Sequence, residues 1–342
     1  MQHEILTAAP LLDQKGDLAE PGWARSLLPV YCRDEIKAGK LRIKEWDYYL
    51  ITDGHIGLAL TIADNGYMGL DSISFLHFDE GWEQTKSPMR LFPRGKTGLP
   101  ETSVDGASEI ARGGYAMAFY HEDDARCLTF HMDNFRGKDA IEGIVRLTDE
   151  PRESIVIATP FDKPKHFYYN QKINCLRAEG WIELGDRRFE LTPDRFFAVL
   201  DWGRGVWTYH NTWYWGSASG LLDGVPFGWN IGYGFGNTAA ASENALFYDG
   251  TLHKLSRVTF EIPQKDGKFD YLAPWKFTSD DNRFYMDFTP MLDRSACMNV
   301  GVLKSDQHQV FGHFTGRVTL DDGTVLPVRD FFGFAERVEN KW

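Results

Sequence analysis

Short strand-like runs separated by tight-turn dipeptides set the strongest limit on how this chain can fold. Aromatic and β-branched residues gather in runs that recur at intervals of roughly 8 to 12 residues. Almost no segment keeps apolar residues at the i, i+3, i+4 and i+7 spacing of a helix, although residues 105–112 favour a short helix or a loop. Four turns carry the Asp-Gly or Asn-Gly pair that tight hairpins favour: Asp53-Gly54, Asn65-Gly66, Asp266-Gly267 and Asp322-Gly323. The sequence therefore predicts an antiparallel, all-β fold.

A long series of hairpins has to hide its strand edges, and closed barrels or packed sandwiches do so. At 342 residues the chain is long enough for two such units. Strand-like runs continue on both sides of residue 200, and about 140 to 170 residues per half suit one eight- to ten-stranded barrel. We predict an N-terminal barrel over residues 1–200 and a C-terminal barrel over residues 201–342.

The charges count against nucleic acid as a partner. Lys and Arg number 37 against 49 Asp and Glu, which gives a formal net charge of -12, and the basic residues form no polybasic run. The first residues show no basic leader followed by an apolar core, and no apolar run approaches the roughly 20 residues of a membrane helix. We therefore expect a cytoplasmic protein without an integral membrane segment.

No familiar motif for a metal, a nucleotide or a covalent nucleophile is present. The sequence has no HExxH, no GxxxxGK[ST], no GxSxG and no dinucleotide-type GxGxxG after a strand. The four cysteines lie far apart without metal-ligand spacing, and we expect free, mostly buried thiols at Cys32, Cys127, Cys175 and Cys297. The sequence therefore predicts neither a metal nor an organic cofactor.

The segment DWGRGVWTYHNTWYWGSASG, residues 201–220, holds four of the eleven tryptophans. If residues 212–217 form a strand, its period of two places Trp213 and Trp215 on one face and Tyr214 on the other. One face of this strand would then carry the indoles.

A second strand-like segment, GWNIGYGFGN at residues 228–237, carries alternate glycines. The same period sets Asn230 and the glycines on one face and Tyr233 on the other. A bare glycine face lets a backbone or a ligand approach closely. We therefore predict a flat aromatic slot in which an indole wall faces a glycine floor.

Three interpretations of these aromatic residues stay open, and one of them is a protein-interaction surface. In the first they fill a barrel interior, and Asp201 and Arg204 form a structural ion pair. In the second they line a pocket for an apolar ligand, as small-molecule sites commonly do, with Asp201, Arg204 and His210 as catalytic candidates. The expected ligand contacts in that pocket are Trp46, Tyr48, Trp207, Trp213, Trp215, Asn230, Tyr233 and Glu243.

Three polar residues near the aromatic runs favour structural roles when each is taken singly. His210 is expected to be a satisfied structural histidine, and Glu243 a solvated or strand-capping residue. Asp47, in the run WDYY, is expected to face outward.

Four stretches together resemble the bacterial domain of unknown function 2804 family, and the resemblance covers nearly the whole chain. They are IKEWDYYLIT (43–52), NFRGKDAIEGIVRL (134–147), the tryptophan-rich segment at 201–220, and GWNIGYGFGNTAAASENALFYDGTLHKLSRVTFEIP (228–263). The resemblance carries no established activity, so it leaves the function open.

A more distant similarity is to the two-domain lipocalin-like group that includes carotenoid 1,2-hydratases and tocopherol cyclase-like proteins. It lies in GWIELGDRRFEL followed by DWG, within residues 180–203. This similarity implies two lipocalin-like (calycin-type) antiparallel β-barrel domains packed side by side. Where the hydratases have an Asp-His-Glu-Trp-like element, this chain has Asp201, Trp202, Gly203 and Arg204. Asp201 alone carries over, and the missing His and Glu count against hydratase activity.

These observations predict a protein that binds a hydrophobic small molecule, with cofactor-free lyase, hydratase or isomerase chemistry on an isoprenoid, lipid or polyketide-like substrate. Asp201 would be the acid, and Arg204 would anchor a carboxylate or enolate oxygen. Indole faces would stabilise a cationic transition state. The alternatives are a non-catalytic lipid or isoprenoid carrier and a structural or interaction protein with filled barrels. The oligomeric state stays open.

Overall fold

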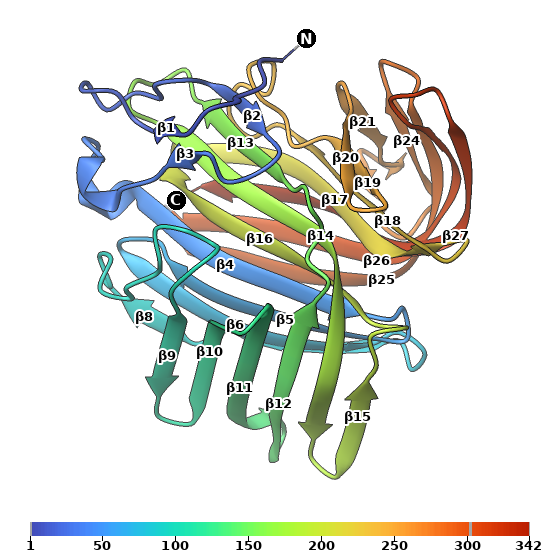
Figure 1. Cartoon of the computed structure of the whole chain (residues 1–342). Helices are drawn as coiled ribbons and strands as arrows, with labels where there is room; N and C mark the ends of the chain where they lie inside the picture. Colours follow the sequence, from blue (N-terminus) through green and yellow to red (C-terminus); the bar gives the residue numbers. More distant parts are fainter. Residues whose placement is uncertain (1, 301–302, 342) are drawn as a thin grey trace.

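The computed structural model describes residues 2–300 and 303–341, and nearly all of their regular structure is β. Two 3-10 turns, η1 (Arg33–Glu35) and η2 (Lys40–Arg42), are the helical elements of this part of the chain. Two large, curled antiparallel sheets form the body of the molecule (Figure 1). Two small two-stranded sheets lie beside them: β1 (Ala9–Pro10) with β3 (Pro29–Val30), and β22 (Gln264–Lys265) with β23 (Lys268–Phe269).

The first large sheet contains 14 strands in the order β7-β6-β5-β4-β16-β14-β12-β11-β10-β9, with β2, β8, β13 and β15 added beside this path. Lys86 of the edge strand β7 donates a hydrogen bond to the backbone carbonyl of Asn134 in β11, so the sheet curls far enough for its edge to reach β11. The strands are β2 (Gly22–Ala24), β4 (Ile43–Thr52), β5 (Ile56–Asp64), β6 (Met68–His77), β7 (Trp82–Lys86), β8 (Met89–Leu91), β9 (Ser108–Arg112), β10 (Tyr115–Glu122), β11 (Ala125–Arg136), β12 (Asp139–Thr148), β13 (Ile155–Pro160), β14 (Phe167–Leu184), β15 (Arg187–Leu191) and β16 (Phe197–Val206).

The second large sheet has nine strands in the order β20-β19-β18-β17-β27-β26-β25-β24-β21. Its edge strands β20 and β21 are consecutive in the chain, and only Leu255, Ser256 and Arg257 separate them. Since a short connection spans at most about 15 Å, the sheet has to curl until its two edges meet. The strands are β17 (His210–Leu222), β18 (Val225–Tyr233), β19 (Ala245–Tyr248), β20 (Thr251–Lys254), β21 (Val258–Glu261), β24 (Trp275–Ser279), β25 (Phe284–Val300), β26 (Leu303–Thr319) and β27 (Val325–Lys341).

The predicted fold class, two lipocalin-like antiparallel barrels side by side, is confirmed. The placement of the domain boundary at residue 200 remains a prediction. The expectation of a helix or loop at residues 105–112 is wrong for its second half, because Ser108–Arg112 forms β9. This edge strand pairs with β10, and its Ser108 turns inward to hydrogen-bond Asp47.

Each sheet encloses its own apolar core, and further aromatic clusters fill the space between the sheets. The first core includes the fully buried Leu58, Phe75 and Phe135. The second is built around Trp229, whose ring lies against Phe284, Phe314 and Phe331. Between the sheets, residues of the first sheet such as Tyr48, Leu50 and Tyr168 pack against residues of the second such as Trp215, Phe235 and Phe334.

Strand β14 joins the two sheets through an irregular stretch. The register of β14 against β16 shifts between Ile173 and Leu176, and Cys175 there adopts a positive φ of 63°. The shift lets Asn174 reach the second sheet, where its amide donates to the hydroxyl of Ser217 at 2.8 Å and to the carbonyl of Trp229 at 3.1 Å. A buried amide with these partners fixes how the sheets meet.

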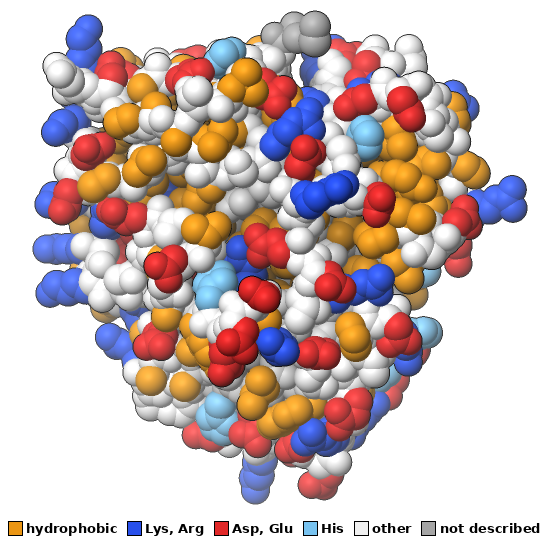
Figure 2. Space-filling model, in the orientation of Figure 1, with side chains coloured by type: hydrophobic (Ala, Val, Ile, Leu, Met, Phe, Trp, Pro, Cys, Tyr) orange, Lys and Arg blue, Asp and Glu red, His pale blue; other side chains and the backbone are white. Residues whose placement is uncertain are grey.

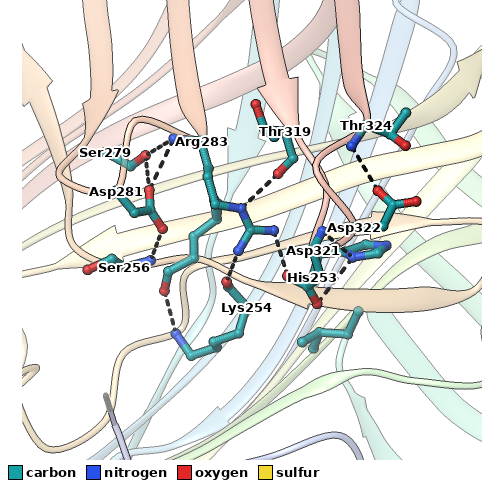
Figure 3. A network of polar contacts seen from close by, with 12 residues as sticks. His253, Lys254, Ser256, Ser279, Asp281, Arg283, Thr319, Asp321, Asp322 and Thr324 are labelled. Carbon is teal, nitrogen blue, oxygen red and sulfur yellow. Dashed lines mark hydrogen bonds and ion pairs between the residues drawn. The ribbon is translucent and has the colours of Figure 1, made fainter.

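The meeting edges of the second sheet are held by side chains (Figure 3). The Arg283 guanidinium donates to the carbonyls of Lys254, at the end of β20, and Thr319, at the end of β26, both at 2.9 Å. It also pairs with Asp321 at 2.6 Å. The Asp281 carboxylate accepts from the backbone N–H of Ser256, which lies in the connection between β20 and β21, at 2.9 Å. Arg283, which directly precedes β25, therefore ties the start of that strand to the ends of β20 and β26.

We expect Arg283→Met to lower the free energy of unfolding by about 2 to 3 kcal/mol, because it removes three hydrogen bonds at once. Arg283→Lys should recover only part of this loss, since an ammonium cannot reproduce the planar fork. Arg257→Met is the control, because Arg257 is largely exposed. Urea unfolding at equilibrium measures all three variants, and a Met variant as stable as the parent chain would contradict the assignment.

Candidate functional site

A cavity of about 480 Å³ opens between the two sheets. Its volume lies within the range of roughly 300 to 1,000 Å³ that small-molecule sites occupy. Strands of the first sheet from β4 to β8, with β14 and β16, form one side, and β17, β25, β26 and β27 of the second sheet form the other. Most of the residues singled out from the sequence line this cavity: Trp46, Tyr48, Asp201, Trp207, Trp213, Trp215 and Glu243.

Indole and phenyl rings form one wall. Trp46 stacks on Tyr168 with ring centroids 5.9 Å apart, and its ring meets Trp207 edge-on at 5.3 Å. Phe235 contacts Trp207 at 4.7 Å and Trp213 at 5.2 Å. The predicted alternation along β17 places Trp213 and Trp215 at the cavity, whereas Tyr214 packs into the second core. Edge-to-face packing of this kind holds the rings in place beside the cavity.

Trp46 can lie flat against the sheet because its cross-strand neighbour is Gly203. A Cβ atom at Gly203 would lie 2.0 Å from the Trp46 ring, so any side chain there would push the indole out of place. The glycine that supports the aromatic wall thus lies in β16, outside the predicted glycine segment.

Lys172 of β14 is the centre of a buried polar cluster on this wall. Its Nζ lies 2.7 Å from an Asp201 carboxylate oxygen and 3.6 Å from one of Glu243. The same ammonium lies 3.9 Å from the centre of the Trp215 ring. Asn170 donates to the other oxygen of Asp201 at 2.6 Å. Both oxygens of Asp201 are therefore engaged as acceptors, by Lys172 and by Asn170.

Glu243 is held by the strand that carries Asn230. The Asn230 amide donates to the Glu243 carboxylate at 3.0 Å and accepts from the Trp215 indole N–H at 2.7 Å. Burial raises the pKa of Glu243 above its ordinary value. A Cβ at Gly232 would lie 2.4 Å from the Glu243 carboxylate, so this glycine makes room for the acid. The predicted glycine floor is therefore wrong, as is the solvated role expected for Glu243.

Glu336 of β27 is a third acid at the cavity. Its carboxylate accepts a hydrogen bond from the Trp213 indole N–H at 2.9 Å and one from Gln309 at 3.4 Å. Burial raises the pKa of Glu336 to about 7. A carboxylic acid with such a pKa is partly protonated at neutral pH and can both give and take a proton.

The remaining walls are divided between apolar and polar side chains. Met68, Leu70 and Met89 of β6 and β8 form an apolar side. Arg294 of β25, together with Gln307 and Gln309 of β26, forms a polar side. Gln309 links this polar side to β4 of the first sheet, because its amide nitrogen donates to the Tyr48 hydroxyl at 3.2 Å and its amide oxygen accepts from Arg294 at 3.0 Å. A ligand with an apolar body and one polar end would fit this division.

Four predicted site residues do not line the cavity. One is Asn230, which is fully buried and hydrogen-bonds Trp215 and Glu243, and the other three lie elsewhere. Arg204 is fully buried on the opposite face of β16, where it donates to Asp47 at 3.0 Å and to the carbonyls of Trp46 and Pro100. His210 is half exposed at the start of β17, with its ring 3.5 Å from Glu339. Tyr233 stacks on Tyr214 in the second core, with ring centroids 4.5 Å apart.

The expected ion pair between Asp201 and Arg204 is wrong, and so is the outward orientation of Asp47. Asp201 and Arg204 are three residues apart on one strand, so they point to opposite faces. Asp47 turns into the first barrel, where it accepts hydrogen bonds from Arg204 and Ser108. Arg204 is therefore a buried structural cation that cannot reach a ligand in the cavity.

Sequence reasoning missed Lys172, Glu336 and Phe235. The run Asn170, Lys172, Asn174 places three polar side chains on one face of a strand rich in apolar residues, and that alternation is the signal that could have revealed Lys172. Phe235 follows the end of β18, where positive φ angles at Gly234 and Gly236 break the alternation and turn the ring to the indoles. Glu336 carries no comparable local signal.

Across residues 2–300 and 303–341, no helix is long and apolar enough to cross a membrane, and no group of His, Cys, Asp and Glu side chains is arranged to hold a metal ion. The predicted free thiols are confirmed for all four cysteines. The expected burial holds only for Cys127 and Cys175, because Cys32 is partly exposed and Cys297 is exposed and lies at the cavity.

The chain was compared with known structures and curated proteins. It is similar to a crystal structure of a Nitrosomonas europaea protein provisionally assigned as AttH, with a TM-score of 0.56 and 14% identity over 96% of this chain and 98% of that one. It is also similar to kievitone hydratase from Nectria haematococca, with a TM-score of 0.48 and 9% identity over 100% of this chain and 97% of that one. No curated protein matches.

The first of these similarities supports the fold and does not extend to function, because the identity is low. The family comparison is more specific, since the model of the domain of unknown function DUF2804 matches residues 2–342. The chain therefore belongs to the DUF2804 family.

Proposed function

We propose that the cavity binds an apolar small molecule and catalyses cofactor-free proton transfer to it, in a hydration, elimination or isomerisation. The observation that carries this proposal is the position of Glu336, a carboxyl group with a pKa raised to about 7 by burial, among indole rings. An acid in such surroundings can protonate a weakly basic carbon or oxygen.

Glu336 is the proton donor in this proposal, in place of the Asp201 predicted from the sequence. Protonation of a carbon–carbon double bond by Glu336 would leave a cation on the neighbouring carbon. Trp46, Trp207 and Trp213 line the cavity, and their rings would stabilise that charge by cation–π attraction.

Asp201 and Glu243 would complete the reaction as acceptors. The Lys172 ammonium holds both carboxylates on the same wall. A carboxylate there would take a proton from a water molecule whose oxygen bonds to the cation, which gives hydration. If it takes a proton from the adjacent carbon, the double bond moves and the result is isomerisation. The same steps in reverse give elimination of water.

The competing function is a non-catalytic carrier of a lipid or isoprenoid. Met68, Leu70 and Met89 support it, because flexible apolar side chains accept ligands of different shape. A carrier would use the same walls but would not need a protonated Glu336.

The indole wall supplies the first test. We expect Trp213→Ala with Trp215→Ala to lower affinity for an apolar fluorescent probe, anilinonaphthalene sulfonate, by at least about tenfold, because each indole buries a large apolar area. Mass spectrometry of an organic-solvent extract should also find a copurified apolar compound in the parent protein and not in the variant. Trp181→Ala is the matched control, since Trp181 lies outside this cavity. Equal probe binding by all three proteins would exclude the site.

The ionisation of Glu336 supplies the second test. Its folded-state pKa of about 7 lies above the ordinary value of 4.5, so the proton it holds stabilises the fold fully below about pH 4.5, and this stability is lost as pH rises through about 7. Glu336→Gln should remove that part of the pH dependence. Urea unfolding at about pH 5 and about pH 8 measures it, with the exposed Glu261→Gln as control.

Activity separates the enzyme from the carrier. Once the copurified compound is known, turnover of it should fall as pH rises above about 7 and should drop by at least about a hundredfold in Glu336→Gln. A Gln variant that binds the compound normally and converts it at the parent rate would remove Glu336 from the mechanism. Binding without any conversion by the parent protein would establish the carrier.

A further inference from the structure

Two segments of this acidic chain contain basic residues and no acidic ones. Residues 36–44 contain four Lys or Arg residues, residues 84–100 contain four more, and neither segment contains an Asp or Glu. The whole chain has a formal net charge of -12, so these segments run against its overall charge. They lie about 50 residues apart in sequence, which is why they form no polybasic run.

The fold brings the two segments together at the turn between β5 and β6. The backbone carbonyl of Leu41 lies so close to Gly66 that a Cβ there would be 2.7 Å from it. On the other side, the N–H groups of Phe92 and Arg94 donate to the carbonyls of Tyr67 at 2.8 Å and Gly66 at 3.1 Å. η2 and the segment after β8 therefore flank one turn and form one surface.

Exposed apolar side chains lie within this surface. Leu91 is 77% exposed, Met89 58% and Phe92 54%, and each projects from or directly follows β8. Leu41 is exposed as well. Two of the neighbouring acids, Asp64 and Asp71, are buried and turn inward, where Asp71 pairs with Arg90 at 2.7 Å. Asp34, Glu35 and Glu101, just outside the two segments, are exposed. Within the two segments themselves, the charge presented outward is basic, from Lys37, Lys40, Arg94 and Lys96.

This surface is continuous with the mouth of the cavity. Met89 both is exposed and lines the cavity. β8 pairs with β6 so that Met89 lies opposite Leu70 and Leu91 opposite Met68, and both partners also line the cavity. Figure 1 places β8 at the left of the molecule, and Figure 2, in the same orientation, shows Lys and Arg side chains projecting along that edge. An apolar ligand that leaves the cavity beside β8 would meet these side chains first.

We propose that the surface formed by residues 36–44 and 84–100 docks on an anionic lipid membrane, with Met89, Leu91 and Phe92 inserted among the lipids. Basic residues beside exposed Leu, Met and Phe are the combination that binds a lipid interface, because charge attracts the protein to anionic headgroups and apolar side chains anchor it. Nucleic acid fits less well, since it offers no apolar layer to Leu91 and Met89. Docking would hold the cavity mouth against the bilayer, so that an apolar compound passes between them without entering water.

Vesicle sedimentation tests the docking with the full chain. The parent protein should bind vesicles made of equal parts phosphatidylcholine and phosphatidylglycerol at least about tenfold more tightly than vesicles of phosphatidylcholine alone, and the difference should shrink as salt is raised. Leu91→Ser with Phe92→Ser should lower binding to the anionic vesicles by at least about tenfold. Arg94→Glu with Lys96→Glu should lower it by a similar factor.

Two matched variants far from β8 control these changes. Val325→Ser alters a side chain that is 55% exposed at the start of β27, and Arg257→Glu reverses an exposed charge beside Asp280. Both should bind anionic vesicles like the parent. The proposal would be overturned if the parent protein stays in the supernatant when anionic vesicles are sedimented, or if the serine and glutamate variants bind these vesicles as the parent does. Single-stranded nucleic acid that binds the parent protein more tightly than the vesicles do, and displaces them, would also overturn the proposal. Probe binding in the cavity is measured separately, so a failure here leaves the proposed function untouched.

Discussion

The ion contact between Lys172 and the carboxylates of Asp201 and Glu243 is the interaction on which the arrangement of the two sheets depends. Lys172 and Asp201 belong to the first sheet, whereas Glu243 follows β18 of the second. A buried charge is costly unless it is paired and hydrogen-bonded, so each member of the cluster needs the others in place. The Trp215 ring over the ammonium and the Asn230 amide on Glu243 extend the same network into the second sheet. The polar cluster therefore fixes the position of the aromatic wall, and the cavity lies beside this wall.

Local patterns in the sequence predicted the fold, but they predicted only part of the candidate site. Alternation and turn dipeptides are local signals, and they sufficed for the strands and for the side of β17 that carries Trp213 and Trp215. The same period of two also places Asp201 and Arg204 on opposite faces of β16. Glu336 could not be found in this way, because its partner Trp213 lies 123 residues away. Which acid reaches an indole across a sheet depends on strand order, and the sequence of either strand alone does not specify that order.

Apolar and polar walls divide the cavity, and this division limits what it can hold. Met68, Leu70 and Met89 offer no hydrogen bond donors, whereas Arg294 and Gln307 offer several. A wholly apolar compound would leave those donors without partners, and a wholly polar one would lose contact with the rings. The acid Glu336 lies with Gln309 and Trp213, where these two environments meet. Protonation would thus take place at the junction of a substrate's polar and apolar parts.

Strand β27 lies in the middle of the second sheet, between β17 and β26, although it is the last strand in sequence. Its ladder with β17 joins Trp215 to Glu336, which lie 121 residues apart in sequence. Pairings across so long a loop form late, since the entropy of closing the loop has to be overcome first. The aromatic wall and the acid that it serves therefore come together in one late folding event. Until that event, β17 would lack its neighbour in the sheet and its edge beside Trp213 and Trp215 would stay unpaired, so this ladder is a step at which folding competes with aggregation.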